Sequence, residues 1–230
     1  MSLEPTRTQI MPPLLTQPVQ RLVAQVEATP SRWMIAFAGM PGSGKTTLAS
    51  RLAEAVNART APNTVVALGM DGFHFTKAAL RQFPNAAEAF ARRGAPWTFD
   101  VFALQQRLQL LRTSAGCADI PWPGFEHAVG DPVEGALMVL ASTRLVIVEG
   151  LYLLHRADGW ETISQLFDER WYLDTPLETA LERLALRHME AWGITRDVAE
   201  HRIATSDRLN AELVRDNAGY ADWRLVVDMN

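Results

Sequence analysis

Apolar residues in this chain gather into short continuous runs, which are separated by stretches with a helical spacing. Short apolar runs are typical of strands that are buried on both faces of a sheet. They occur at 35–38, 64–69, 145–148, 170–173 and 224–228. In the intervening stretches apolar residues recur every three or four positions, which predicts helices. We expect these helices at 16–28, from about 45, and at 76–83, 86–93, 101–112, 160–167, 176–192 and 195–215.

Strands that alternate with helices throughout a chain predict a parallel sheet with helices on both faces. The expected fold is therefore an α/β three-layer sandwich (α/β/α) with a mainly parallel, doubly wound sheet, whose ligands bind at the carboxyl ends of the strands. One domain is expected over 16–230. Residues 1–15 hold several prolines and no continuous apolar core, so we expect a flexible arm there. The stretch 114–134 has no clear period and is expected to be irregular.

A glycine-rich motif lies between the first predicted strand and the helix that follows it. Residues 39–46 read GMPGSGKT and match G-x-x-x-x-G-K-[ST], the phosphate-binding P-loop, without a mismatch. Gly39, Gly42 and Gly44 permit backbone angles that let successive N–H groups converge on a phosphate. Lys45 supplies a cation for the β- and γ-phosphates, and Thr46 supplies a hydroxyl for Mg²⁺. The motif predicts a P-loop NTPase fold.

Two carboxylates follow buried runs and are expected near the P-loop. Asp71 comes directly after the second run, and Glu149 ends LVIVE, the pattern of a Walker B acid. If the second strand lies beside the first, Asp71 lies near the γ-phosphate, where it either accepts the proton of an attacking hydroxyl or holds Mg²⁺ through water. Glu149 either contacts the Mg²⁺ shell or orients a nucleophile. Each acid could instead simply end a strand.

Arginines are concentrated in two predicted helices that meet at Gly193. Arg183 and Arg187 are four residues apart and therefore share a helix face. An arginine-rich helical hairpin suits a lid, expected at about 183–202, that closes over the nucleotide and neutralises the transferred phosphoryl group. The arginines could equally be solvated and paired with neighbouring acids. The arginines concerned are Arg183, Arg187, Arg196, Arg202 and Arg208.

Other polar candidates fall in loops above the carboxyl edge of the sheet. Arg92 and Arg93 precede a glycine, and His127 follows an aromatic residue and a glutamate. His127 could hydrogen-bond a substrate hydroxyl or lie on the surface, and the same two interpretations apply to His74 in MDGFH. Asp71, His74, Arg93 and His127 are therefore our candidate substrate-binding residues.

Composition narrows the range of partners. A net charge of −4 and a pI of about 5.8 give no reason to expect nucleic acid as a partner. No apolar run reaches the length of a membrane span, so membrane insertion is not expected. The single cysteine, Cys117, cannot form an internal disulfide, which suits a reducing compartment. A cytoplasmic location is therefore expected.

The ordered set of motifs resembles the P-loop kinases that include phosphoribulokinase, uridine kinase and pantothenate kinase. The set runs from about 31 to 228 and consists of GMPGSGKTT, MDGFH, RRGAPWTFD, FEHAVGDP, VIVEG, YLDTPLETALERLALRH and YADWRLVVD. Within this family the chain looks most like kinases linked to fructose-type sugar transport systems. The resemblance implies ATP with Mg²⁺ as the phosphate donor and a small-molecule hydroxyl as the acceptor. Dimers are common among such relatives, so it also allows a homodimer.

The resemblance also implies roles for individual residues. Asp71 would be the catalytic base and Glu149 the Walker B acid, which would hold the metal together with Thr46. Arg187 would be the lid arginine, with Arg183 beside it, and both Arg187 and Lys45 would be catalytic. His127 would contact the substrate. The residues that would bind the ATP phosphates are Gly39, Pro41, Gly42, Ser43, Gly44, Lys45, Thr46 and Thr47.

These observations favour an ATP-dependent small-molecule kinase, a phosphotransferase with an alcohol group as acceptor. A sugar such as fructose is the first candidate acceptor, while nucleosides, pantothenate-like compounds and sugar phosphates stay open. A P-loop switch that hydrolyses nucleotide to change partners is the alternative from another class. The sequence lacks the Asn-Lys-x-Asp motif of switch GTPases and the Leu-Ser-Gly-Gly-Gln-type signature of transporter ATPases. A kinase is therefore the better interpretation.

Overall fold

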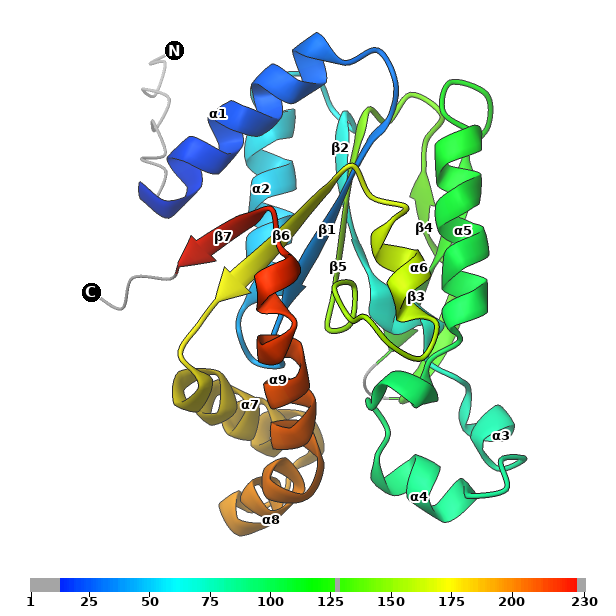
Figure 1. Cartoon of the computed structure of the whole chain (residues 1–230), viewed down its shortest axis with the longest axis vertical. Coiled ribbons are helices and arrows are strands. Elements are labelled where there is room, and N and C mark those ends of the chain that lie inside the picture. The colour runs from blue at the N-terminus through cyan, green and yellow to red at the C-terminus, as the bar shows by residue number, and fades with distance from the viewer. Residues whose placement is uncertain (1–12, 127–128, 227–230) are drawn as a thin grey trace, which may run out of the picture.

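The strands of the molecule form two sheets. The computed structural model describes residues 13–126 and 129–226. Its strands are β1 (Trp33–Gly39), β2 (Val65–Gly69), β3 (Ile120–Glu126), β4 (Asp131–Val139), β5 (Leu145–Gly150), β6 (Glu169–Asp174) and β7 (Trp223–Val226). Five of them make a parallel sheet in the order β2-β5-β1-β6-β7 (Figure 1), and β3 pairs antiparallel with β4. The predicted mainly parallel sheet is confirmed.

Helices connect the strands and cover the sheet. They are α1 (Pro13–Ala28), α2 (Lys45–Asn57), α3 (Lys77–Leu80), α4 (Ala86–Ala91), α5 (Val101–Thr113), α6 (Trp160–Ser164), α7 (Leu177–Trp192), α8 (Arg196–Arg202) and α9 (Arg208–Asp216). Short 3-10 turns are η1 (Met70–Phe73), η2 (Pro96–Thr98) and η4 (Ala218–Tyr220). A π-helical turn, η3 (Ile203–Asp207), joins α8 to α9. The helix predicted at 195–215 is therefore present, with a π turn inside it.

The core has two halves, one on each face of the sheet, because side chains alternate along a strand. In β1, Ile35 and Phe37 face the half that contains α1 and α2. Met34 and Ala36 face the other half, to which α5, α6, α7 and α9 contribute. Figure 1 shows α1 and α2 on one side of the sheet and α5 and α6 on the other. This is the expected three-layer arrangement.

The register of the sheet brings the ends of three strands to one rim. Glu149 of β5 lies opposite Phe37 of β1 and Gly69 of β2. Parallel strands all point the same way, so the segments that follow Gly39, Gly69 and Gly150 leave the sheet at its carboxyl edge. Figure 1 shows α7, α8 and α9 on one side below this edge, and α3 and α4 on the other.

The prediction that 114–134 is irregular was wrong. Much of this stretch belongs to the β3–β4 hairpin, where Pro121, Pro123 and Gly124 interrupt the apolar alternation that would have indicated a strand. The pairing register shifts between Trp122 and Gly124. Trp122 is fully buried, and its Nε1 donates a hydrogen bond to the carbonyl oxygen of Gly69 at 2.9 Å. The indole thus attaches the hairpin to the carboxyl edge of the sheet.

Several helix boundaries differ from the predicted ones, and α3, α4 and α6 all end earlier than expected. The first helix begins at Pro13 rather than Thr16, and the rest of the proposed arm, 1–12, lies outside the described residues. The hydroxyl of Thr175, which precedes α7, donates a hydrogen bond to the carbonyl oxygen of Ser43 at 3.2 Å. The threonine therefore ties the P-loop to the segment that leads into α7.

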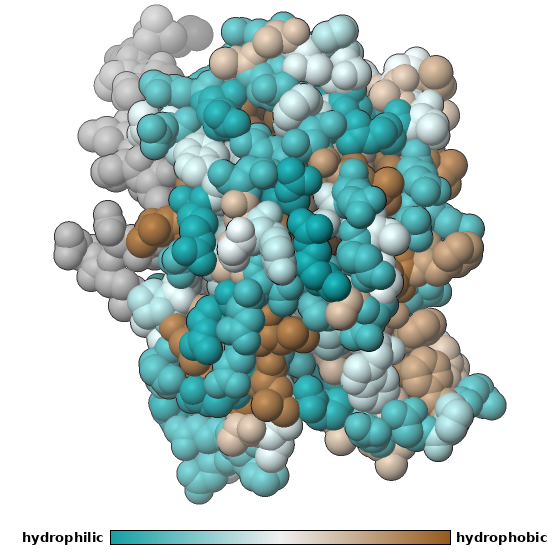
Figure 2. Space-filling view, in the orientation of Figure 1, coloured by the Kyte–Doolittle hydropathy of each residue, from teal (hydrophilic) through white to brown (hydrophobic). Residues whose placement is uncertain are grey.

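Figure 2 shows a face that is mainly hydrophilic, with apolar residues in smaller patches. Among the described helices, none combines the length and apolar character that crossing a bilayer requires.

Candidate active site

The P-loop connects the end of β1 to the start of α2 and is pressed against α7. Gly42 and Gly44 have positive φ angles of 77° and 92°. A Cβ on Gly42 would lie 2.0 Å from the carbonyl oxygen of Ala180 in α7, so a side chain cannot fit there. A Cβ on Gly44 would have open space around it. The loop is thus closed on the α7 side and open on the other, as a backbone cradle for a phosphate would be.

Lys45, Thr46 and Glu149 gather at the open side of the loop. The Thr46 hydroxyl donates to Oε1 of Glu149 at 3.0 Å. Burial raises the pKa of Glu149 above its usual range, and the nearby Asp71 adds to this effect, while Lys45, Thr46 and Arg187 oppose it. All five of these residues line one cavity.

The donor set fits Mg²⁺. A hydroxyl and one carboxylate are the protein ligands that this ion commonly takes when substrate phosphates and water supply the rest. Among the described residues, no group of three or more His, Cys, Asp or Glu side chains could hold a metal by itself. Thr46 and Glu149 therefore suit an ion that arrives with a nucleotide rather than one held by the protein alone.

Asp71 lies in η1, directly after β2. The arrangement on which its prediction depended, with the second strand beside the first, is wrong because β5 lies between β1 and β2. Asp71 nevertheless reaches the P-loop, because β2 ends level with Glu149 and η1 turns towards it. Gly72 makes this turn possible: a Cβ there would lie 2.1 Å from the carbonyl oxygen of Pro123 in the hairpin.

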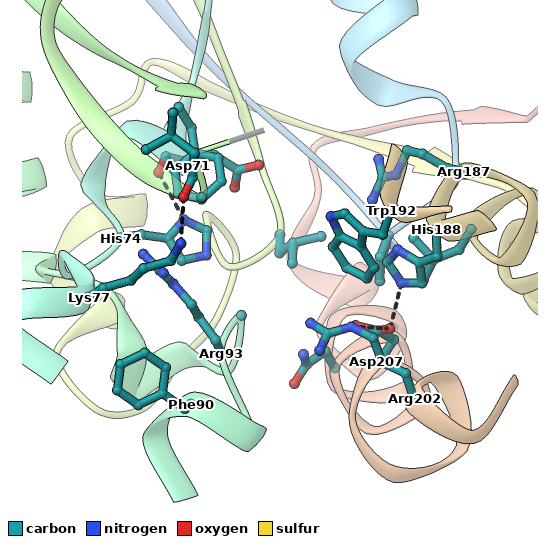
Figure 3. Close-up of a pocket in the computed structure, with 18 residues that line it drawn as sticks. Asp71, His74, Lys77, Phe90, Arg93, Arg187, His188, Trp192, Arg202 and Asp207 are labelled. Carbon is teal, nitrogen blue, oxygen red and sulfur yellow. Dashed lines mark hydrogen bonds and ion pairs between the residues drawn. The ribbon is translucent and has the colours of Figure 1, made fainter. Parts of the chain in front are cut away.

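Two cavities meet beside Asp71. The first, which we call the nucleotide cavity, has a volume of about 430 Å³ and is lined by Lys45, Thr46 and Glu149. The second, which we call the acceptor cavity, has a volume of about 370 Å³ and lies between the α3–α4 region and the α7–α9 region (Figure 3). The residues that line both cavities are Pro41, Asp71, Phe125, Leu151 and Arg187.

One wall of the acceptor cavity comes from η1, α3 and the segment after α4. Nδ1 of His74 lies 2.8 Å from the carbonyl oxygen of Asp71, and the His74 ring lies 4.7 Å from that of Phe125. Lys77 and Arg93 extend from the same wall, beside His74 (Figure 3). Two of the predicted substrate-binding residues, His74 and Arg93, thus line this cavity with Asp71, while His127 lies outside the described residues.

The opposite wall is built from residues that the sequence analysis did not single out for it. Nε2 of His188 and Oδ2 of Asp207 lie 2.9 Å apart and are buried. Trp192 stacks on His188, with ring centroids 4.4 Å apart. Arg202 lies over the Trp192 ring at 5.0 Å, and its Nε is 3.7 Å from Asp207. The one available signal was the spacing of His188 and Trp192, which places them on one helix face.

The five arginines singled out around the predicted lid have different surroundings. Arg187 lines both cavities, and Arg202 lines the acceptor cavity. Arg196 is paired with Glu182 at 2.6 Å and with Glu200, as expected for a solvated helix surface. The other two are not among the lining residues of either cavity: Arg208 pairs with Glu178, and Arg183 is exposed.

Comparison with known proteins agrees with this geometry. The family model described as "AAA domain" matches residues 35–204. A putative uridine kinase of Schizosaccharomyces pombe is 37% identical over 188 residues, which cover 81% of this chain and 79% of that protein. An ATP-dependent kinase-like protein of Aspergillus versicolor is 39% identical over 153 residues, covering 64% and 88%. A crystal structure of a putative fructose transport system kinase from Silicibacter sp. has a TM-score of 0.78 at 30% identity, covering 90% and 98%.

Proposed function

Because this chain belongs to the P-loop kinase family, we propose that it transfers the γ-phosphate of ATP to a hydroxyl group of a small metabolite. The observation that carries the proposal is that Asp71 and Arg187 line both the nucleotide cavity and the acceptor cavity. An acceptor hydroxyl and a terminal phosphate could therefore meet between these two side chains. A sugar such as fructose is the first acceptor to test.

The residues of the site divide the work of phosphoryl transfer. Main-chain N–H groups of the P-loop and the Lys45 ammonium would bind the β- and γ-phosphates. Thr46 and Glu149 would hold Mg²⁺, which supplies positive charge to the phosphate oxygens when it is bound. Asp71 would accept the proton of the acceptor hydroxyl. The hydroxyl oxygen of the acceptor would form the new bond to the γ-phosphorus as the bond from that phosphorus to ADP breaks. Arg187 would neutralise charge on the transferred group.

The size of the acceptor cavity supports a kinase over a nucleotide-hydrolysing switch. A switch needs room for one attacking water, which occupies about 30 Å³ in the liquid. The acceptor cavity, at about 370 Å³, is in the range of sites that hold a small organic molecule. A nucleoside or a pantothenate-type compound would also fit this volume, so these acceptors belong in the same test.

A coupled assay of ATP consumption tests the proposal. The panel contains sugars, nucleosides and vitamin precursors, and each compound is measured with Lys45→Ala as the matched inactive control. We expect at least one compound to raise ADP production well above the rate without acceptor and to yield a phosphorylated product by mass spectrometry. ADP production that is equally fast with and without every acceptor would instead identify a nucleotide hydrolase.

A further inference from the structure

The acceptor cavity is lined by more cations than carboxylates. Lys77, Arg93, Arg187 and Arg202 line it, against the carboxylates of Asp71 and Asp207. Asp207 is already engaged by His188 and Arg202. Among the described residues, no carboxylate oxygen lies within the 4.0 Å salt-bridge limit of the Lys77 ammonium or the Arg187 guanidinium.

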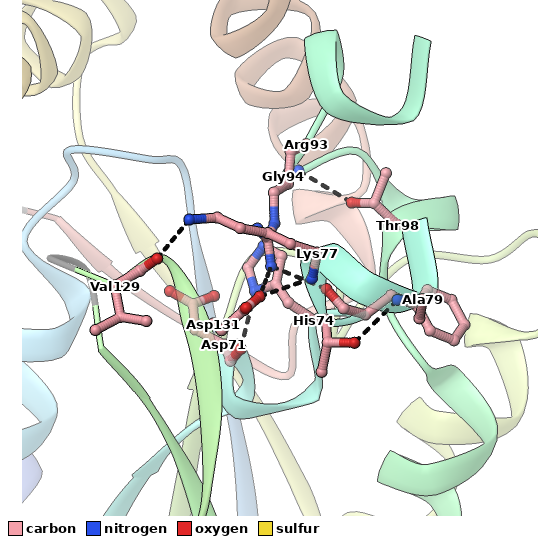
Figure 4. Close-up of polar contacts among 11 residues, drawn as sticks. Asp71, His74, Lys77, Ala79, Arg93, Gly94, Thr98, Val129 and Asp131 are labelled. Atoms are coloured by element: carbon pink, nitrogen blue, oxygen red, sulfur yellow. Dashed lines mark hydrogen bonds and ion pairs between the residues drawn. The ribbon is translucent and has the colours of Figure 1, made fainter. Parts of the chain in front are cut away.

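On the wall beside His74, one carboxylate bonds to the side chain of Arg93 and to the main chain of Lys77. Oδ1 of Asp131 accepts hydrogen bonds from Nη2 of Arg93 at 3.1 Å and from the main-chain N–H of Lys77 at 2.8 Å (Figure 4). Burial would raise the pKa of Asp131, but the Lys77 amide and the Arg93 guanidinium lower it overall. Asp131 is therefore ionised at neutral pH and balances only one of the two positive charges.

The Lys77 side chain is held at the edge of the cavity by the β3–β4 turn. Its Nζ donates to the carbonyl oxygen of Val129, as Figure 4 shows. An ammonium group has three N–H donors, so this bond leaves two of them for another acceptor. Arg93 lies beside it, with its guanidinium 5.7 Å from the centre of the Phe125 ring. Both side chains line the same cavity as Asp71 and give this wall its positive charge.

We propose that the acceptor carries an anionic group, a phosphate or a carboxylate, that binds between Lys77 and Arg93 while its hydroxyl reaches Asp71. This inference rests on the proposed kinase function and names the class of its acceptor, an anionic compound in place of a neutral sugar such as fructose. The physical reason is electrostatic. The anionic group of the acceptor would be repelled by the Asp71 carboxylate in a partly enclosed site. The positive charges of Lys77 and Arg93 offset this repulsion. Charge-assisted hydrogen bonds to Lys77 and Arg93 would also fix which hydroxyl faces the nucleotide.

Matched pairs of acceptors test the proposal. The pairs are fructose with fructose 1-phosphate, ribose with ribose 5-phosphate, and glycerol with glycerate, so that phosphate and carboxylate are separate arms. We expect kcat/KM to be at least about tenfold higher for the charged member of a pair, as for hydrogen bonds to charged groups. Faster turnover of neutral than of charged members overturns the anionic acceptor and leaves the kinase intact. No turnover with any acceptor overturns both.

Substitutions of Lys77 test whether the anionic group of the acceptor binds beside this side chain. Lys77→Gln removes the charge but can still donate to Val129, whereas Lys77→Arg keeps the charge. We expect Lys77→Gln to raise the KM for the charged acceptor about tenfold or more, with kcat and the KM for ATP little changed. Lys77→Arg should recover most of the affinity. If Lys77→Gln binds the charged acceptor as well as the unaltered protein does, Lys77 only tethers the turn and the inference is wrong.

Arg81→Gln is the matched control. Arg81 immediately follows α3, stacks on Phe90 with its guanidinium 6.0 Å from the ring centre, and does not line the acceptor cavity. Its loss removes the same unit of charge from the same region. Both variants are checked by thermal unfolding, so that a damaged fold is recognised. A rise in KM that is equal in Arg81→Gln and Lys77→Gln would reflect the general field of the protein, and it would overturn a local anion site.

Discussion

The phosphate side and the acceptor side of the site are built in different ways. The P-loop, Lys45 and Thr46 come from one continuous segment, and its shape is imposed by close backbone contact with α7. The acceptor cavity is assembled from three separate regions of the chain, namely η1 with α3, the β3–β4 hairpin, and α7 with η3. We therefore expect most substitutions to affect one side alone, whereas changes to Asp71 or Arg187, which line both cavities, should affect both.

Asp71→Asn changes a residue that lines both cavities and should have a large effect on turnover. The amide keeps the shape of the side chain but cannot accept the hydroxyl proton, and loss of a general base lowers the rate by about 10²–10⁴. We expect kcat to fall by this amount while the KM for ATP changes little, as measured by steady-state kinetics with a fixed acceptor. A variant that keeps its kcat and loses affinity for ATP would place Asp71 on the phosphate side alone.

On the phosphate side, Lys45→Ala should remove turnover with every acceptor. The variant lacks a preorganised positive charge at the place where negative charge develops in the transition state. Such a loss typically raises the activation barrier by about 3–4 kcal/mol. The fold should be retained, since the ammonium lines the nucleotide cavity rather than the core. The measurement compares kcat for two chemically different acceptors together with a circular dichroism melt. Near-normal turnover in the folded variant would remove the P-loop from the mechanism.

The phosphate side could be predicted from the sequence more fully than the acceptor side, because it is built from one continuous segment. The P-loop was readable because its strand, glycines, lysine and helix are contiguous, so local pattern and final structure agree. The position of Asp71 near the P-loop was expected, but from a strand order that the structure does not have. The pairing of His188 with Asp207 was not readable, because it depends on how α7 packs against α9 and on the π turn that places Asp207.

Two arginines in the segment 183–202 have different surroundings and should respond differently to substitution. Both Arg187 and Arg196 are exposed, but Arg187 lines both cavities whereas Arg196, on α8, is paired with two glutamates. We expect Arg187→Ala to lower kcat by about 10², as for the loss of one stabilising donor, and to change stability by less than about 0.5 kcal/mol. Arg187→Lys should recover only part of the activity, because an ammonium lacks the planar fork. Arg196→Ala is the matched control and should leave kcat unchanged.

Hydrogen exchange tests whether these arginines lie on a moving element. If 183–202 closes over ATP, its amides should exchange quickly without nucleotide and slowly with an unreactive ATP analogue. Exchange in β5, which is buried along its whole length, provides an internal reference. If exchange at 183–202 is the same with and without nucleotide, this segment is an ordinary structural helix pair. The same conclusion follows if Arg187→Ala loses stability but retains its kcat.

The smallest effect is expected from Asp207→Asn, on the acceptor wall. The asparagine can still accept a hydrogen bond from His188 but loses the charge that holds His188 and Arg202 together, so we expect a loss of about 1 kcal/mol in unfolding free energy. Since both partners line the acceptor cavity, the KM for the acceptor should rise while the KM for ATP stays the same. Glu190→Gln, an exposed site on the same α7 helix as His188, is the control for stability. An equal rise in both KM values would show that the two sides are coupled through the lid, and the separation between chemistry and acceptor choice would fail.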